Sequence, residues 1–441
     1  MLSTYPPREC GIATFAQDLL SYCVKSREAD ISYKVAALNL TPLDTHKYPP
    51  EVKWEIGQNN KEDYKQLAHT INTDESISGV IIQHEYGIFG GKEGEHILHF
   101  MKKCTKPMLV TFHTVLPTPL AKMKQVTSDI IKCASSIIVL TKSSKKILEK
   151  LYPDGRGKIS VIPHGIHPIT FSAPKKNKIK LELGNRTVLS TFGLLSAGKG
   201  IQHVIQALPK VIEKYPSILY LILGETHPVV RRKEGEKYRL SPSRLVTKLK
   251  LQRHVRLYHQ HLALDDLFLF LKATDIYICT STNPNQAVSG TLSYALGAGR
   301  PVVSTEFSQS KEIVTRDVGR LVPIKDSTSI SSALLDLLGD TPRLLEMSAV
   351  AYKKTRKMLW SSVAKQYIRL LTQTVLPQLN MNHIQTMTDD FGLFQFATFT
   401  TANKDFGYTL DDNARALILC SWFSKKNPTR QLERLLKIYL T

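Results

Sequence analysis

Residues 281–306 carry the side chains whose types and spacing most clearly suggest chemistry. The segment reads as a loop after a short buried strand, followed by Ser289, Gly290 and Thr291 at the start of a helix of small residues. Such a helix start presents free backbone N–H groups and the positive end of the helix dipole. The segment therefore predicts an anion-binding turn, although an ordinary capped helix would use the same residues.

Further polar, glycine-containing loops follow the other predicted strands, where ligands bind in open α/β sheets. A histidine at a strand end is more often a hydrogen-bonded structural residue than a catalyst, and each loop taken alone is ordinary turn chemistry. Their repetition at matching positions of two successive domains favours a ligand-binding role. The loops are PRECGI (7–12), QHEYGIFGG (83–91), TFHT (111–114), PHG (163–165), GLLSAGKG (193–200) and GETHP (224–228).

The elements that must position these loops alternate short β-branched runs with helical stretches. This alternation predicts an α/β fold of two doubly wound Rossmann-like domains facing across a cleft. The expected strands are 1–4, 31–38, 80–83, 108–112, 136–140 and 159–162, then 188–193, 219–223, 255–258, 275–279 and 301–303. The expected helices include 12–24, 143–151, 200–215, 265–273, 292–299 and one around 360–374 that packs back across the domain boundary.

The expected domains are 1–173 and 181–376, joined by a polar, basic linker at 174–180. Beyond residue 376 the sequence becomes rich in Thr, Asp, Asn and Phe. One or two helices bury no core of their own. Residues 377–441 therefore predict a short helical remnant, the start of an incomplete module.

Composition limits the classes of function. The net charge of +21 suits nucleic acid, an anionic membrane surface or a phosphorylated small molecule as partner, or simply a solvated face. The basic clusters are dispersed and lack a stacking aromatic set, so nucleic acid is disfavoured. The six cysteines form no CxxC pair, and no run of about 20 apolar residues or signal-type start is present, so we expect a cytoplasmic protein with peripheral membrane contact left open.

Over residues 1–376 the chain resembles glycosyltransferases of the GT-B fold, family 4. The similarity rests on YPPRECGIATF, QHEYGIFGG, TFHTVLPTP, VIPHGI, GLLSAGKGI, LGETHPVVRRKEGEKYR and NQAVSGTLSYALGAGRPVVST. Two later strings, TDDFGLFQFATF and GYTLDDNARAL, resemble the start of a C-terminal α/α-toroid module that is shortened here. In the second of them, Asp411, Asp412, Asn413 and Arg415 resemble a carbohydrate-contacting motif.

The resemblance implies transfer of a sugar from a nucleotide-diphosphate sugar to a glycan or lipid-linked acceptor. It implies retention at the anomeric carbon, no metal and no cofactor besides the sugar donor. Catalytic roles fall to His113, Lys199 and Gln286. Donor contacts fall to Gly11, Gly193, Lys199, Glu225, Thr226, His227, Ser289, Gly290, Thr291 and Tyr294, and acceptor-side positions to His84, Glu85, Phe89 and Gly90. Loops 224–228 and 258–261 would hold the base.

Three positions depart from the family pattern. Gln286 and Tyr294 stand where members carry two glutamates, and Leu194 replaces a common basic residue. An amide hydrogen-bonds a sugar but does not offset positive charge as a carboxylate does. Two alternatives therefore remain beside the transferase: a catalytically decayed sugar-nucleotide or glycan binder, and a membrane or nucleic-acid binder that relies on charge alone.

Overall fold

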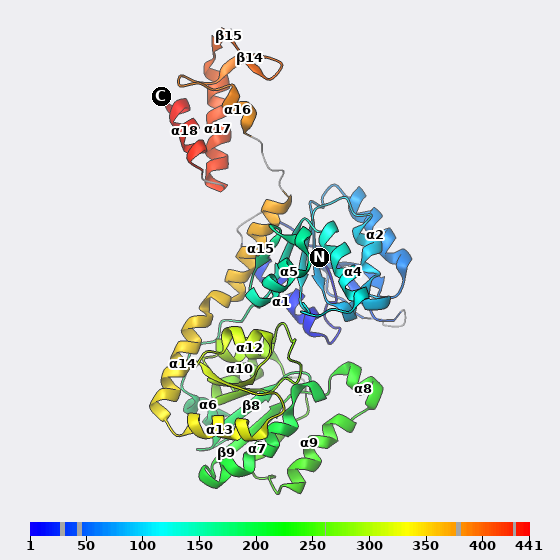
Figure 1. Ribbon diagram of the computed structural model, residues 1–441, viewed down its shortest axis with the longest axis vertical. Helices are drawn as coiled ribbons and strands as arrows, with labels where there is room; N and C mark the ends of the chain where they lie inside the picture. Colours follow the sequence, from blue (N-terminus) through cyan, green and yellow to red (C-terminus); the bar gives the residue numbers. More distant parts are fainter. Residues whose placement is uncertain (27–30, 42–45, 261, 376–380, 427–428) are drawn as a thin grey trace. The chain divides into compact units, whose positions relative to one another are not determined.

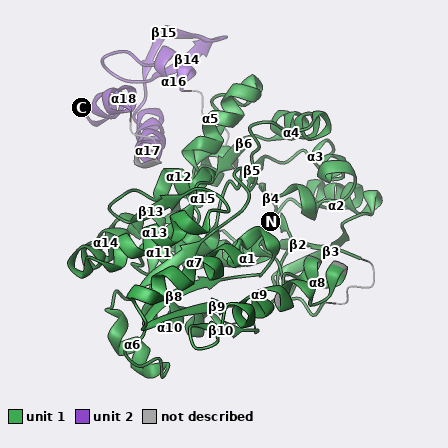
Figure 2. Cartoon of the chain, turned by 60° about the horizontal axis from the view of Figure 1, so that its bottom comes forward, with its two compact units in different colours: residues 1–375 green, residues 376–441 purple. Residues whose placement is uncertain are grey.

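The computed structural model describes residues 1–26, 31–41, 46–260, 262–375, 381–426 and 429–441. The chain divides into two compact units, residues 1–375 and 376–441 (Figure 2). The expected boundaries at 173 and 181 fall inside the first unit, and the second unit begins one residue before the expected 377.

The first half of unit 1, blue to cyan in Figure 1, contains a seven-stranded parallel sheet. The strand order is β3-β2-β1-β4-β5-β6-β7. Its strands are β1 Leu2–Ser3, β2 Val35–Asn39, β3 Val52–Gly57, β4 Val80–His84, β5 Met108–Phe112, β6 Ser136–Val139 and β7 Ile159–Val161. Its helices are α1 Gly11–Ser26, α2 Lys61–Thr73, α3 Ile97–Met101, α4 Ala121–Cys133 and α5 Lys142–Leu151, with short 3₁₀ turns at η1 Tyr86–Ile88, η2 Lys92–Gly94 and η3 Pro153–Gly155.

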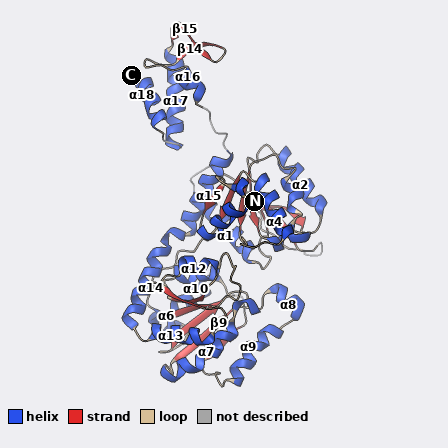
Figure 3. Ribbon diagram, viewed as in Figure 1, coloured by secondary structure: helices blue, strands red, loops and turns tan. Residues whose placement is uncertain are grey.

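The second half contains a six-stranded parallel sheet in the order β10-β9-β8-β11-β12-β13. Its strands are red in Figure 3, among helices drawn in blue. Its strands are β8 Thr187–Phe192, β9 Ile218–Leu223, β10 Val255–Tyr258, β11 Ile276–Cys279, β12 Val302–Thr305 and β13 Gly319–Val322. The helical elements are α6 Pro174–Lys180, η4 Ala197–Lys199, α7 Ile201–Lys214, α8 Pro228–Glu234, α9 Lys237–Lys248, α10 Leu264–Ala273, α11 Gly290–Gly297, α12 Ser308–Ile313, α13 Ser327–Leu338, α14 Thr341–Thr355, η5 Arg356–Met358 and α15 Trp360–Val375.

Helices cover both faces of each sheet, as the continuous apolar strands predict. In β9 the side chains alternate between two cores: Tyr220 and Ile222 pack against α7, α9 and α13, whereas Leu219 and Leu221 pack against α10, α11 and α14. The first sheet is divided in the same way between α2, α3 and α4 on one face and α1 and α15 on the other. Both parts of the expected double winding are therefore present.

Helix α15 crosses from the second sheet to the first, as its sequence predicts. Trp360, Val363 and Tyr367 pack against Phe15 and Leu19 of α1. The Tyr367 hydroxyl lies 3.1 Å from Thr111 Oγ1 at the end of β5. This crossing ties the two halves together and explains why they form one compact unit.

Some sequence expectations need correction. Residues 174–180 form helix α6 rather than an irregular linker: Pro174 opens the helix and the Asn177 side chain is buried, bonded to Ser172 Oγ at 3.1 Å. Strand β2 begins at Val35 rather than at residue 31. Strands β3 and β13 were not predicted, because β3 is a half-exposed edge strand and β13 begins with Gly319 and has only four residues.

Unit 2 is more than a helical remnant. It contains α16 Asn382–Thr386, a hairpin of β14 Phe394–Thr398 and β15 Thr401–Tyr408, and helices α17 Leu410–Lys426 and α18 Arg430–Leu440. Its buried apolar cluster is small and centres on Cys420, Leu432 and Leu435. Among the described helices of the chain, none is long and apolar enough to cross a membrane.

Candidate active site

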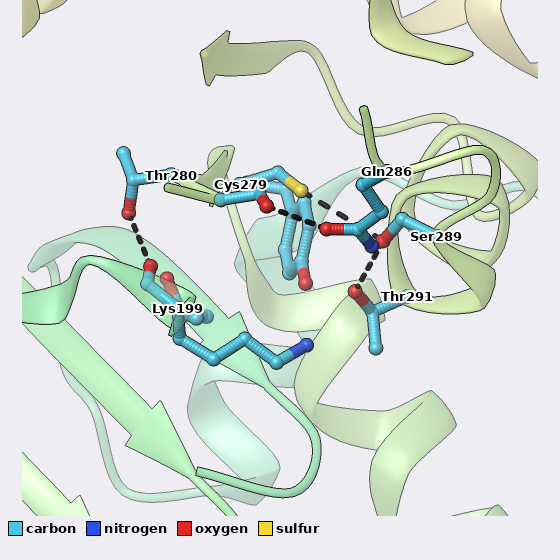
Figure 4. A pocket seen from close by; sticks show the side chains of 9 residues that line it. Lys199, Cys279, Thr280, Gln286, Ser289 and Thr291 are labelled. Carbon is cyan, nitrogen blue, oxygen red and sulfur yellow. Dashed lines mark hydrogen bonds between the residues drawn. The ribbon is translucent and has the colours of Figure 1, made fainter. Parts of the chain in front are cut away.

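A pocket opens at the carboxyl end of the second sheet, where β8 and β11 lie side by side. The strand order reverses between these two strands, which is where open α/β sheets bind ligands. The pocket is lined by Thr191, Lys199, Tyr277, Cys279, Thr280, Ser281, Gln286, Ser289 and Thr291 (Figure 4). It brings together Lys199, Gln286, Ser289 and Thr291 of the expected site.

Lys199 supplies the positive charge of the pocket. Its backbone carbonyl accepts a hydrogen bond from Thr280 Oγ1 at 2.8 Å, and its ammonium end lies toward Thr291 (Figure 4). Within the described residues no carboxylate forms an ion pair with this ammonium, and burial lowers the pKa of Lys199. A desolvated cation without a carboxylate partner is a strong attractor for an anionic ligand.

The start of helix α11 supplies two hydrogen-bond donors. Ser289 caps the helix, its Oγ accepting from the Leu292 N–H at 3.3 Å. Neither the Gly290 N–H nor the Thr291 N–H has a hydrogen-bond partner in the part of the chain that the structure describes. Two free N–H groups beside Lys199 can bind phosphate oxygens.

Gln309 of α12 fixes this turn and was missed by the sequence analysis. Its Oε1 accepts from the Ser289 N–H at 2.6 Å, and its Nε2 donates to Ser293 Oγ at 3.2 Å. The expected phosphate contact of the Ser289 backbone is therefore corrected, since that N–H is already used. Gln309 lies 20 residues along the chain in a different helix, so no local pattern marks it.

Gln286 lines the pocket with its amide already bonded inside its own loop. Ser281 Oγ donates to Gln286 Oε1, and Gln286 Nε2 donates to the Val288 carbonyl at 3.0 Å. The remaining lone pair of Oε1 is the group that this side chain can still offer to a ligand.

Tyr294 lies outside the pocket, which corrects its expected donor contact. Its hydroxyl donates to Asp18 Oδ2 of α1 at 3.1 Å, and His167 Nε2 lies 3.1 Å from the same oxygen. Tyr294 is on the same side of α11 as Gly290, where an added Cβ would lie 2.9 Å from His164 Nε2. This side of α11 contacts the first half of unit 1, so Tyr294 joins the two halves.

The loop residues of the second sheet divide into two groups. Gly193 approaches the pocket: its φ is +119°, and an added Cβ would lie 3.4 Å from Lys199 Nζ. Burial lowers the pKa of His227, and the charge of Lys199 lowers it further. By contrast Thr226 is buried and donates to Glu236, and Glu225 pairs with Arg231 at 3.2 Å, so these two side chains serve the loop itself.

The first sheet presents His113, Glu85 and Gly11 at the ends of its strands. His113 is 9 % exposed, and its Nε2 lies 2.8 Å from Gln83 Oε1. Glu85 is half-buried and accepts from Thr114 Oγ1 at 2.6 Å, and burial raises its pKa. Gly11 is exposed at the first residue of α1, with no atom within 4 Å of an added Cβ.

His84, Phe89 and Gly90 are structural residues, which corrects their expected acceptor-side role. His84 and Phe89 are buried in the core of the first sheet, with ring centroids 5.7 Å apart and stacked. An added Cβ on Gly90 would lie 2.1 Å from the Gln58 carbonyl oxygen, so this glycine permits a close backbone approach. Residue 261 of the expected base-binding loop lies outside the described residues.

The burial of His84 is expected to make the stability of the fold depend on pH. Both ring nitrogens lack a hydrogen-bond partner among the described residues, and burial lowers the pKa of His84 to about 3. Because the unfolded chain binds a proton below about pH 6.5 and the folded protein does not, this histidine destabilises the fold increasingly as pH falls toward 3. We expect His84→Phe to be more stable than the natural protein, with an advantage that grows by about 2 kcal/mol between pH 6.5 and 5.

Urea unfolding at several pH values measures this advantage, and His69→Phe on the surface of α2 is the matched control. An advantage that stays constant with pH would contradict the assignment of a neutral, buried imidazole to position 84.

Among the described residues, the cysteines form no disulfide and no side-chain cluster is arranged to hold a metal ion. All six cysteines lie in described ranges and are free thiols. Across the described residues, no group of three or more His, Cys, Asp or Glu side chains is arranged to hold a metal ion. In unit 2, Asp411 and Asp412 pair with Arg415, and Asn413 bonds to the backbone of Leu393 and Thr409.

Two parallel sheets, each covered by helices on both faces, with a pocket at the switch point of the second, give unit 1 the GT-B fold. Solved structures agree with this architecture. A glycosyltransferase from Rickettsia africae superposes with a TM-score of 0.65 at 15% identity, covering 86% of this chain and 98% of that one. Anabaena HepE, solved with UDP and glucose, gives a TM-score of 0.63 at 17% identity over 84% and 98% of the two chains.

Residues 173–358, which contain the whole pocket, match the family model described as glycosyl transferases group 1. A phosphatidyl-myo-inositol mannosyltransferase of Mycolicibacterium smegmatis is 25% identical over 270 residues, 60% of this chain and 64% of that protein. An uncharacterized glycosyltransferase of Methanocaldococcus jannaschii is 28% identical over 181 residues, 40% of each chain. The chain thus spans just under two thirds of the length of the first of these relatives.

Proposed function

We propose that the protein transfers a sugar from a nucleotide-diphosphate sugar to a hydroxyl group of a glycan or lipid-linked acceptor. The observation that carries this proposal is the pocket in which Lys199 lies beside the free N–H groups of Gly290 and Thr291. The group 1 family and the relatives named as mannosyltransferase and as a UDP-glucose complex supply the chemical class.

The pocket residues suit the departure of a nucleoside diphosphate. As the bond between the anomeric carbon and the distal phosphate oxygen breaks, negative charge grows on that oxygen. Lys199 and the two N–H groups are fixed before the reaction and stabilise this charge. The acceptor oxygen forms its bond on the same face of the sugar and passes its proton to the departing phosphate oxygen, so configuration is retained and no metal is needed.

A second candidate is a sugar-nucleotide binder that no longer catalyses transfer. The Gln286 amide is bonded at both ends within its loop, and the Tyr294 hydroxyl is bonded to Asp18. The family resemblance leads one to expect a carboxylate at positions 286 and 294, and neither Gln286 nor Tyr294 carries one. This candidate keeps the anion pocket and loses turnover.

A ligand and turnover screen separates the two candidates. The full chain is melted with UDP, GDP, ADP and their glucose and mannose conjugates, and release of nucleoside diphosphate is then measured with membrane-lipid and oligosaccharide acceptors. We expect one nucleotide to raise the melting temperature and its sugar conjugate to turn over. Stabilisation without turnover favours the binder, and cooperative melting with no nucleotide effect contradicts both.

A further inference from the structure

We infer that Gln83 is a positioning residue that holds His113 as a neutral imidazole, with Nδ1 free to accept a hydrogen bond from a hydroxyl group of the transferred sugar. Gln83 is the next-to-last residue of strand β4 and pairs with Thr111 of β5, two positions before Glu85. The inference rests on the proposed sugar transfer and adds to it a residue and a direction of hydrogen bonding.

The geometry of His113 is fixed on three sides. Its backbone N–H donates to the His84 carbonyl at 3.0 Å, and its Nε2 lies 2.8 Å from Gln83 Oε1. The ring of Phe15 in α1 meets the imidazole edge to face, with centroids 4.7 Å apart and planes at 89°. The Gln83 amide presents its oxygen to the ring, and an amide oxygen only accepts, so in this orientation Nε2 carries the proton and donates it to Gln83.

The other ring nitrogen is left available. Nδ1 of His113 has no hydrogen-bond partner among the described residues. It is not among the side-chain nitrogen and oxygen atoms that are both fully buried and without a partner, so it is accessible to solvent. Gln83 itself is completely buried. An unprotonated Nδ1 is an acceptor, and hydroxyl groups are the donors that a sugar brings.

The surroundings keep this imidazole uncharged. Burial is the largest effect and lowers the pKa of His113 to about 3, and the charged forms of His164 and His84 would lower it further. His84 lies on β4 and His164 follows β7, while α1 contributes the uncharged Phe15. No carboxylate among the described residues contacts the His113 ring, so nothing there favours its protonation.

Nitrogen NMR of the full chain labelled with ¹⁵N-histidine tests the tautomer directly. The His113 signals, identified by their loss in His113→Asn, should show a protonated Nε2 and a bare Nδ1 from pH 8 down to pH 5. In Gln83→Glu the carboxylate favours the imidazolium, so His113 should take up a second proton within this range. A bare Nε2 in the natural protein, or no change in Gln83→Glu, overturns the inference.

Turnover of UDP-glucose supplies the functional readout. Protonation converts Nδ1 from acceptor to donor, so kcat of Gln83→Glu should fall as pH is lowered and recover as it is raised. Gln83→Met, which keeps the size but loses the acceptor, should lower kcat about tenfold with an unchanged Kd for UDP. Gln66→Glu on the exposed side of α2 is the charge control, with no change in the pH profile.

The two readouts also separate this inference from the proposed function. A correct tautomer in a protein without turnover leaves Gln83 as inferred and counts against transfer. Turnover with pH profiles identical in the natural protein and Gln83→Glu counts against the role of Gln83 alone.

Discussion

Replacing Lys199 with methionine is expected to weaken UDP binding about a hundredfold while leaving the unliganded protein at least as stable as before. A hydrogen bond between a charged donor and phosphate contributes about 3 kcal/mol, which corresponds to that factor. Lys199 is the cation in the pocket, and its ammonium has no carboxylate partner among the described residues. No other lining residue can replace its charge.

The expected stability of Lys199→Met follows from the burial of the Lys199 ammonium group. Burial lowers the pKa of Lys199, which means that the folded protein disfavours the charged form. Methionine keeps the aliphatic stem and removes the desolvated charge, so the fold is expected to keep or gain stability. The site is therefore maintained at a cost to stability, as expected for a residue kept for binding.

Isothermal titration calorimetry with UDP measures the change in affinity, and urea unfolding measures the change in stability. Lys210→Met is the matched control, because Lys210 lies on the exposed side of the adjacent helix α7. Full UDP affinity in Lys199→Met would remove Lys199 from the anion site. Lost affinity together with a large loss of stability would make its role structural.

Gly165→Ala is expected to destabilise unit 1 by about 3 kcal/mol. An added Cβ would lie 2.1 Å from Trp360 Cδ2 and 2.2 Å from Cε3, and Trp360 is completely buried. The next residue, Ile166, donates to the Met358 carbonyl and accepts from the Trp360 N–H, at 2.8 and 2.9 Å. A methyl group at position 165 therefore displaces the Trp360 indole and weakens the backbone hydrogen bonds of Ile166 with Met358 and Trp360 at the start of helix α15.

Urea unfolding measures the loss, and Gly87→Ala is the control, since nothing lies within 4 Å of a Cβ at that exposed glycine. Trp360→Phe should recover part of the stability when combined with Gly165→Ala, because the smaller ring leaves room for the methyl group. Additive effects of the two substitutions would show that the loss does not come from this contact.

The fold and the helix start at Ser289 could be predicted from local sequence. Buried β-branched runs such as Met108–Phe112 form strands whatever their neighbours, because only a sheet covered on both faces hides a strand that is apolar on both sides. The Ser-Gly-Thr start of α11 likewise needs no distant partner to begin a helix, because the Ser289 side chain caps it locally. Helix α6 was missed because four lysines in seven residues resemble a solvated linker.

The roles of individual site residues could not be predicted from sequence, because they depend on contacts between distant segments. Tyr294 stands at the position expected for a donor contact, yet Asp18, 276 residues away, takes its hydroxyl. Ser289 gives its N–H to Gln309. His84 and Glu85 are neighbours in sequence, but His84 is the last residue of the fully buried strand β4, whereas Glu85 follows the strand and is half-buried.

The sequence by itself therefore determined the architecture and the position of the phosphate-type turn, since both follow from periodicity and from the free groups of a helix start. Tertiary structure decided which donors remain free, that Lys199 lacks a carboxylate partner among the described residues, and that Gln83 directs His113. Each of these depends on which polar groups meet across strands and helices far apart in the chain. A hydrogen bond satisfied by a distant residue leaves no trace in the local sequence.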